Sequence, residues 1–123
     1  MPADIRIIHA HEFIQATPEG KLDLQGTKKV LREISSISVP FDDFDVILDT
    51  RTAQSEVMSV TDLWYLAGEL HKFREAFSRK MAVVVPAKRF DHAGFFALCA
   101  QERGFRVSAF TSLGDAMEWL SEA

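Results

Sequence analysis

The sequence predicts an α/β fold: a single domain built on a mixed, mostly parallel β-sheet with about four helices. Two apolar runs that suit buried strands, 46–48 and 81–85, are each followed by a segment of helical periodicity. A third strand-like segment, 105–110, precedes a last helical segment in the same way. Strands that alternate with helices form parallel sheets through right-handed crossovers. We therefore expect residues 1–123 to form one domain.

The amino-terminal part adds strands that do not fit the alternating pattern. Residues 5–9 and 12–16 predict two short strands or one bent strand, and residues 17–20 form a turn rich in Pro and Gly. Asp23 is placed to cap a helix that runs to about residue 36. This part should supply an antiparallel edge to the sheet and one of the helices.

The segment 59–77 has the strongest helical pattern in the chain. Ser59 and Asp62 have the spacing of a capping box, with Asp in place of the usual Glu. Apolar residues then recur at helical spacing. They are Val60, Leu63, Ala67, Leu70 and Phe77.

The strand 81–85 is stopped by Pro86. Asp91 is predicted to cap the following helix, 92–103, and Gly104 to supply its left-handed end.

The last two elements follow the same logic. Residues 105–110 alternate between apolar and polar side chains, which is typical of a less buried strand. Ser112 and Asp115 repeat the capping-box spacing and predict a final helix.

The composition is that of a folded protein with a slightly acidic balance. The apolar fraction of 47% and charged fraction of 26% are close to globular averages. A net charge of −4 argues against nucleic-acid binding, which needs a basic surface. The N-terminus lacks a signal-peptide pattern, and no apolar run approaches the about 20 residues that span a bilayer. The single Cys99 favours a reducing, cytoplasmic setting.

Polar side chains gather where the central strands end. Asp49 and Arg51 follow the strand 46–48, and two interpretations stay open. They form a local ion pair that ends the strand, or they make a polar contact at the carboxyl edge of the sheet, where open α/β sheets bind their ligands.

The hydroxyls of Ser59 and Thr61 lie at the predicted start of a helix, beside Asp62. Capping alone accounts for Ser59. A phosphate at this place would also be tolerated, because a helix N-terminus carries partial positive charge.

The densest polar cluster follows the strand 81–85. It consists of Lys88, Arg89, Asp91 and His92. The two cations could hold an anion beside a helix start, and the alternative is a solvated loop in which Asp91 caps the helix. Parallel topology places this cluster on the same sheet edge as Arg51.

The sequence offers no constellation for catalysis, and we predict neither enzyme activity nor a cofactor. His9 and His11 share one face of a strand, but no third metal ligand has matching spacing, so no metal site is predicted. Cys99 lies among apolar residues and is expected to be buried and inert. Trp64 and Tyr65 make the apolar stripe of the long helix wide enough to serve a partner or a second copy in a homodimer.

In element order and in local stretches the chain resembles the STAS domains, that is, the SpoIIAA-like anti-sigma-factor antagonists and their STAS/SEC14-type relatives. The likeness is carried by 44–51 leading into 60–64, by 81–86, and by 104–107 followed by 115–120. It covers nearly the whole chain. The resemblance implies a non-enzymatic regulatory or protein-interaction module with a protein partner.

The family's regulatory signature is an Asp-Ser-Ser-Gly-Leu segment whose serine is phosphorylated by a partner kinase. The matching stretch here reads Met58-Ser-Val-Thr-Asp-Leu63, so the signature is absent, and Ser59 and Thr61 are the nearest hydroxyls. The alternative function is a small-ligand module that binds an anion or, by the SEC14-type likeness, a lipid-like molecule. Its charged residues would be Arg51, Lys88 and Arg89.

Overall fold

A computed structural model describes residues 4–8, 12–37, 40–55 and 58–122. Its centre is a five-stranded sheet with the order β1-β2-β4-β6-β7. The strands are β1 (Asp4–Ile8), β2 (Phe13–Thr17), β4 (Asp45–Asp49), β6 (Lys80–Val84) and β7 (Arg106–Phe110). The β1–β2 pair is antiparallel and every other pair in this sheet is parallel. The predicted mixed, mostly parallel sheet with an antiparallel edge is confirmed.

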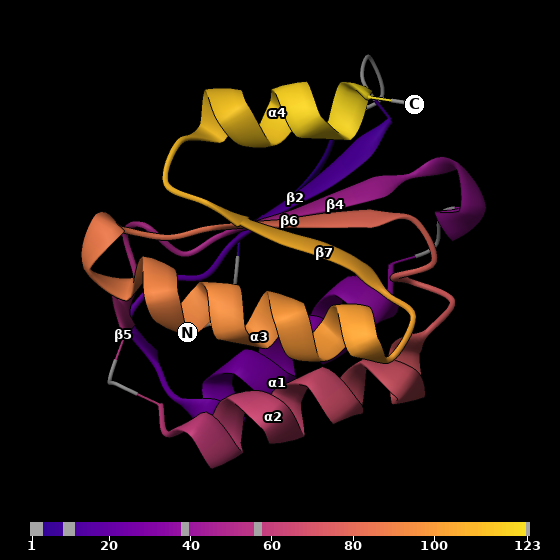
Figure 1. The fold of residues 1–123 in the computed structure, drawn as a ribbon. Helices are drawn as coiled ribbons and strands as arrows, with labels where there is room; N and C mark the ends of the chain where they lie inside the picture. The colour runs from indigo at the N-terminus through magenta and orange to yellow at the C-terminus, as the bar shows by residue number, and fades with distance from the viewer. Residues whose placement is uncertain (1–3, 9–11, 38–39, 56–57, 123) are drawn as a thin grey trace.

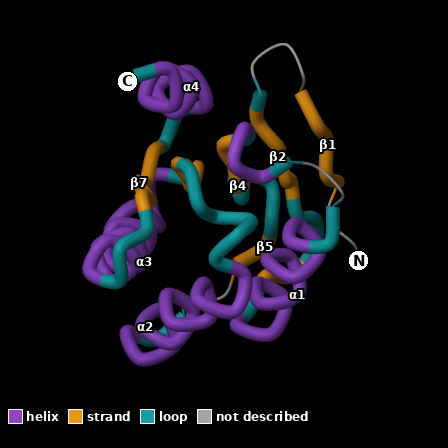
Figure 2. Tube along the Cα trace, turned by 90° about the vertical axis from the view of Figure 1, so that its right-hand side faces the viewer, coloured by secondary structure: helices purple, strands orange, loops and turns teal. Residues whose placement is uncertain are grey.

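Within the described residues, four α-helices cover the two faces of the sheet unequally (Figure 1). One face packs against α1 (Leu24–Ser35), α2 (Val60–Glu69) and α3 (Phe90–Glu102), and the other against α4 (Leu113–Ser121). Two short parallel strands, β3 (Lys21–Leu22) and β5 (Gln54–Ser55), form a second small sheet beside the three-helix layer. Figure 2 shows α1 and α2 below the sheet and α4 above it.

The core follows from the alternation of side chains along buried strands. All five residues of β4 are buried. Val46 and Leu48 pack toward the three-helix layer, whereas Ile47 packs toward α4. Successive residues of a strand point to opposite faces, so a continuous apolar run is what a sheet covered on both sides requires.

The predicted capping residues of three helices are confirmed. The side chain of Asp23 accepts a hydrogen bond from Gly26 N at 2.8 Å. Ser59 Oγ accepts from Asp62 N at 3.1 Å, while Ser59 N donates to Asp62 Oδ2 at 3.3 Å, which completes the capping box. Ser112 Oγ accepts from Asp115 N at 3.3 Å.

The helix predicted over 59–77 is shorter than expected. The α-helix ends at Glu69 and continues as a 3-10 turn, Leu70–Phe73. Leu70 and Phe77 are buried, as their spacing indicated, but they reach the core through this tighter turn and the turns after it. The chain must reverse direction here to begin β6 at Lys80. Residues at helical spacing therefore stay buried beyond the end of the α-helix.

The prediction that Asp91 caps the third helix is wrong. The helix α3 begins at Phe90, its N-cap residue is Arg89, and no side chain makes the capping hydrogen bond. A 3-10 turn, Ala87–Arg89, enters the helix directly, with Arg89 N donating to Pro86 O at 2.9 Å. Asp91 lies in the first turn, where a carboxylate still favours the positive helix end. The left-handed Gly104 after α3 is confirmed, with φ +90°.

Candidate functional site

The loop that leads from β4 to α2 and the loop that leads from β6 to α3, called the β4–α2 and β6–α3 crossings below, leave the sheet at the same edge. They are hydrogen-bonded to each other. Thr50 N donates to Val84 O at 2.8 Å, and the Nη2 atom of Arg89 donates to Thr50 O at 2.9 Å. Arg89 therefore ties the segment before α3 to the segment after β4. The expectation that the two polar crossings share one sheet edge is confirmed.

Asp49 and Arg51 form the local ion pair that was one of the two interpretations. The Nε and Nη2 atoms of Arg51 donate to Asp49 Oδ1 and Oδ2 at 2.9 and 2.8 Å, and Arg51 N donates to Oδ1 at 3.1 Å. Burial alone would raise the pKa of Asp49, but the hydrogen bonds and positive charge of Arg51 outweigh it and lower that pKa. The same bonds raise the pKa of Arg51. The charge of Arg51 is thus compensated within its own crossing.

The start of α2 presents its polar groups to solvent. Ser59 and Thr61 are exposed, and Asp62 is half-buried. The Ser59 oxygen serves as a cap, so the hydroxyl has a structural role as well as an accessible position. None of these three residues lines the cavity described next.

A cavity of about 260 Å³ lies between the sheet and the three-helix layer, at the edge where the crossings leave. The strands and their ends contribute the apolar residues Leu22, Leu48, Val83 and Val85. The helices and the residue before α2 contribute Leu31, Met58, Leu63, Leu66, Ala93 and Phe96. The interior of the cavity is therefore formed by six separate parts of the chain.

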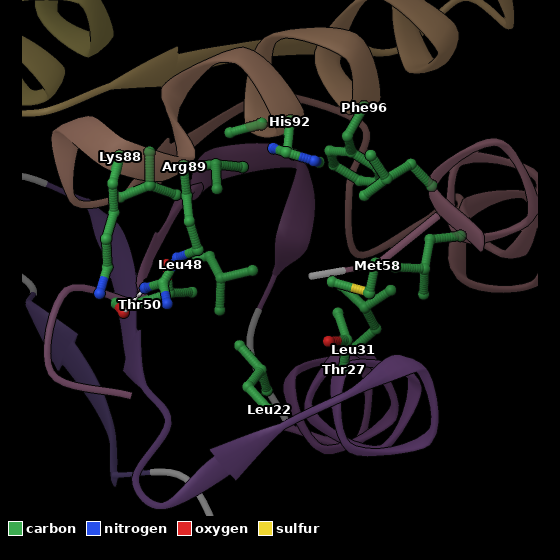
Figure 3. Close-up of a pocket in the computed structure, with 15 residues that line it drawn as sticks. Leu22, Thr27, Leu31, Leu48, Thr50, Met58, Lys88, Arg89, His92 and Phe96 are labelled. Atoms are coloured by element: carbon green, nitrogen blue, oxygen red, sulfur yellow. Dashed lines mark hydrogen bonds between the residues drawn. The ribbon is translucent and has the colours of Figure 1, made fainter. Parts of the chain in front are cut away.

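The polar residues that line the cavity are two threonines, two cations and a histidine: Thr27, Thr50, Lys88, Arg89 and His92. Figure 3 shows Lys88 and Arg89 extending from the segment before α3 toward Thr50 in this view. Burial lowers the pKa of Arg89 from its ordinary value. No acidic residue is among the described residues that line the cavity, and Asp91 is exposed outside it.

The structure therefore divides the predicted site residues into two groups. Lys88, Arg89 and His92 come together at the cavity, whereas the Asp49–Arg51 pair and the start of α2 lie outside its lining. Sequence reasoning missed the apolar lining. The signals that could have found it were the alternation of Val83 and Val85 and the position of Met58 just before the capping box.

The predicted apolar stripe of the long helix is mostly buried, but three residues at its margin are exposed in the structure. Val60, Trp64 and Tyr65 are 63%, 55% and 49% exposed. The Cζ atom of Arg103 lies 4.8 Å from the centroid of the Trp64 ring, and the Nζ atom of Lys28 lies 5.2 Å from the centroid of the Tyr65 ring. These cations cover part of the rings and leave an apolar surface on α2.

The sequence offered three further residues as candidates for chemistry, Cys99, His9 and His11. Cys99 is buried, as expected. His9 and His11 lie outside the described residues. Within the part of the chain that the structure describes, no three His, Cys, Asp or Glu side chains are grouped to hold a metal.

No helix in the described segments is long and apolar enough to cross a membrane.

Comparison with known proteins establishes the fold. No protein-family model matches the chain, and no curated protein matches it. An anti-sigma factor antagonist from Mycobacterium paratuberculosis superimposes with a TM-score of 0.58 and 16% identity, over 98% of this chain and 93% of that one. An uncharacterized protein with a SpoIIAA-like fold from Shewanella loihica superimposes with a TM-score of 0.56 and 16% identity, over 96% of this chain and 91% of that one. The chain has the SpoIIAA-like, STAS-type fold that its sequence resembled.

Proposed function

We propose that this protein is a non-enzymatic regulatory module of the cytoplasm that binds a protein partner through the start of α2. The observation that carries the proposal is an exposed apolar pair beside two exposed hydroxyls. Val60 and Trp64 are 63% and 55% exposed and stand four residues apart, so they share one helix face. Ser59 and Thr61 lie at the same helix start. The interface need not bury a large area, because a few residues, often aromatic, contribute most of the binding energy.

The hydroxyls give this surface a means of regulation. Ser59 Oγ accepts one hydrogen bond, from Asp62 N, and the residue is exposed to solvent. A phosphate at this N-cap position would add negative charge next to Asp62 while the helix N-terminus tolerates it. Modification would then change the charge of the contact surface and leave the packed face of α2 in place. The shared fold with an anti-sigma factor antagonist supports a role of this kind.

The proposal is tested by comparing variants of the contact surface as baits. The wild-type protein should recover a partner from a native lysate, and Ser59→Asp and Trp64→Ser should weaken the purified complex by about tenfold or more. Leu98→Ser is the matched control, because Leu98 is 53% exposed but lies on α3. Circular dichroism checks that each variant is folded. Equal affinity of all four proteins for the partner would overturn the proposal.

A second candidate function, small-ligand binding, is favoured by a separate observation. The cavity of about 260 Å³ is apolar inside and has Lys88, Arg89 and His92 in its lining. Apolar cavities with a few polar groups are the usual form of ligand sites. Native mass spectrometry of the purified protein should detect a retained ligand. A protein that is always empty, and whose melting temperature no anion or amphiphile changes, would contradict this candidate.

A further inference from the structure

We propose that the cavity binds a single-chain amphiphile with a carboxylate head group and about ten non-hydrogen atoms. Its hydrocarbon chain would fill the apolar interior, and its carboxylate would meet Lys88 and Arg89. This inference rests on the ligand-binding candidate and names its ligand class. It does not depend on the protein partner proposed for α2.

The size of the cavity sets how much of a hydrocarbon chain it can hold. An apolar cavity of about 150 Å³ holds a benzene molecule of six carbon atoms. On that scale the 260 Å³ of this cavity holds about ten non-hydrogen atoms. Octanoate, with eight carbons and two oxygens, has that number. A two-chain phospholipid is far too large to be enclosed.

The chemistry of the interior selects a hydrocarbon chain. Ten of the lining residues are aliphatic or aromatic. The two threonine hydroxyls are engaged: Thr27 Oγ1 donates to Asp23 O at 2.7 Å, and Thr50 Oγ1 donates to Val84 O at 3.0 Å. Among the described residues no buried side-chain nitrogen or oxygen lacks a hydrogen-bond partner. A polar group placed inside would therefore lose its hydration without full replacement, whereas an alkyl chain would not.

The charges at the cavity select an anionic head group. Lys88 is exposed, Arg89 is half-buried, and no described residue of the lining is acidic. Arg51 is excluded from this role because Asp49 pairs with it at 2.8 Å. One N–H of Arg89 binds Thr50 O, and a guanidinium has five. Carboxylates form short, charge-assisted hydrogen bonds with such groups.

The test measures octanoate binding to the full chain by calorimetry at pH 7, below the micelle-forming concentration. We expect one molecule bound per protein, with acetate and octan-1-ol each at least about tenfold weaker. Acetate as strong as octanoate would mean a simple anion site. Octan-1-ol as strong as octanoate would mean that the cations take no part. Either result, or no octanoate binding, overturns the proposal.

Variants locate the binding. Lys88→Met should weaken octanoate by about tenfold, and Lys29→Met, at an exposed position on α1, is the matched control and should leave it unchanged. Ala93→Phe places a large side chain in the cavity lining and should abolish binding. If Ala93→Phe does not fold, Lys88→Met decides. Octanoate binding that neither Lys88→Met nor a folded Ala93→Phe weakens would overturn the proposal.

The outcomes separate this inference from the two functions proposed above. A ligand found by native mass spectrometry in a protein that ignores octanoate would overturn the ligand class and keep the ligand-binding candidate. Loss of partner binding by Ser59→Asp would leave octanoate binding intact, because Ser59 is outside the cavity lining.

Discussion

The crossings β4–α2 and β6–α3 leave the same sheet edge but compensate their charges differently. In the first, Asp49 neutralises Arg51 and the start of α2 carries a complete capping box. In the second, Lys88 and Arg89 line a cavity that has no acidic residue in its described lining, and α3 starts without a side-chain cap. A crossing whose polar groups satisfy one another presents a fixed surface. A crossing with uncompensated cations keeps its attraction for an anion.

The largest expected effect comes from breaking the compensated crossing. Arg51→Ala removes the partner of a carboxylate whose side chain is only 8% exposed. Because the side chain of Arg51 is itself 41% exposed, we expect a loss of about 1.5–2 kcal/mol in unfolding free energy at pH 7. Urea denaturation measures it, with Lys29→Met as the control. A loss no larger than that of the control would show that the pair does not stabilise the fold.

The same pair predicts a pH dependence. Arg51 lowers the pKa of Asp49 in the folded protein, so the pair's stabilisation is fully present above the unfolded-state pKa and is lost as pH falls through the folded-state value. The stability difference between wild type and Arg51→Ala should be constant from neutral pH down to about pH 5 and shrink below about pH 4. Urea denaturation across this range checks it. A difference that grows on acidification would contradict the assignment.

A smaller effect distinguishes the two cations of the second crossing. Arg89→Met removes the 2.9 Å hydrogen bond to Thr50 O that joins the crossings, and should cost about 1 kcal/mol. Lys88→Met removes an exposed charge and should change stability by less than about 0.5 kcal/mol. Chemical denaturation of both variants tests the contrast. Equal losses would mean that Arg89 has no structural role.

An effect of the same size as that of Arg89→Met concerns the capping box. Ser59→Ala removes the oxygen that accepts from Asp62 N and should cost about 1 kcal/mol, whereas Ser59→Asp keeps an acceptor and should cost less than about 0.5 kcal/mol. Thermal unfolding should show a decrease of about 3–5 °C for Ser59→Ala. If Ser59→Asp were the less stable variant, its use as a folded mimic of phosphoserine would fail.

Features that depend on neighbouring residues were mostly predicted correctly from the sequence. The two predictions that were wrong also have local causes. The caps at Asp23, Ser59 and Ser112 involve residues three positions apart, so spacing alone indicates them. The helix over 59–77 was predicted too long because residues 70 and 77 are buried at helical spacing without being part of the α-helix. The cap at Asp91 was wrong because the chain enters α3 through a 3-10 turn after Pro86.

The sequence by itself determined the alternating elements and the caps at Asp23, Ser59 and Ser112, and it offered the Asp49–Arg51 pair as one of two interpretations, because each depends on residues close in the chain. The tertiary structure alone decided the cavity and the bond that joins Arg89 to Thr50, 39 positions away. The cavity exists because β3, α1, α2, α3 and the ends of β4 and β6 meet at one sheet edge without filling it. How completely separate elements fill their common space depends on their packing, and no local pattern of residues records it.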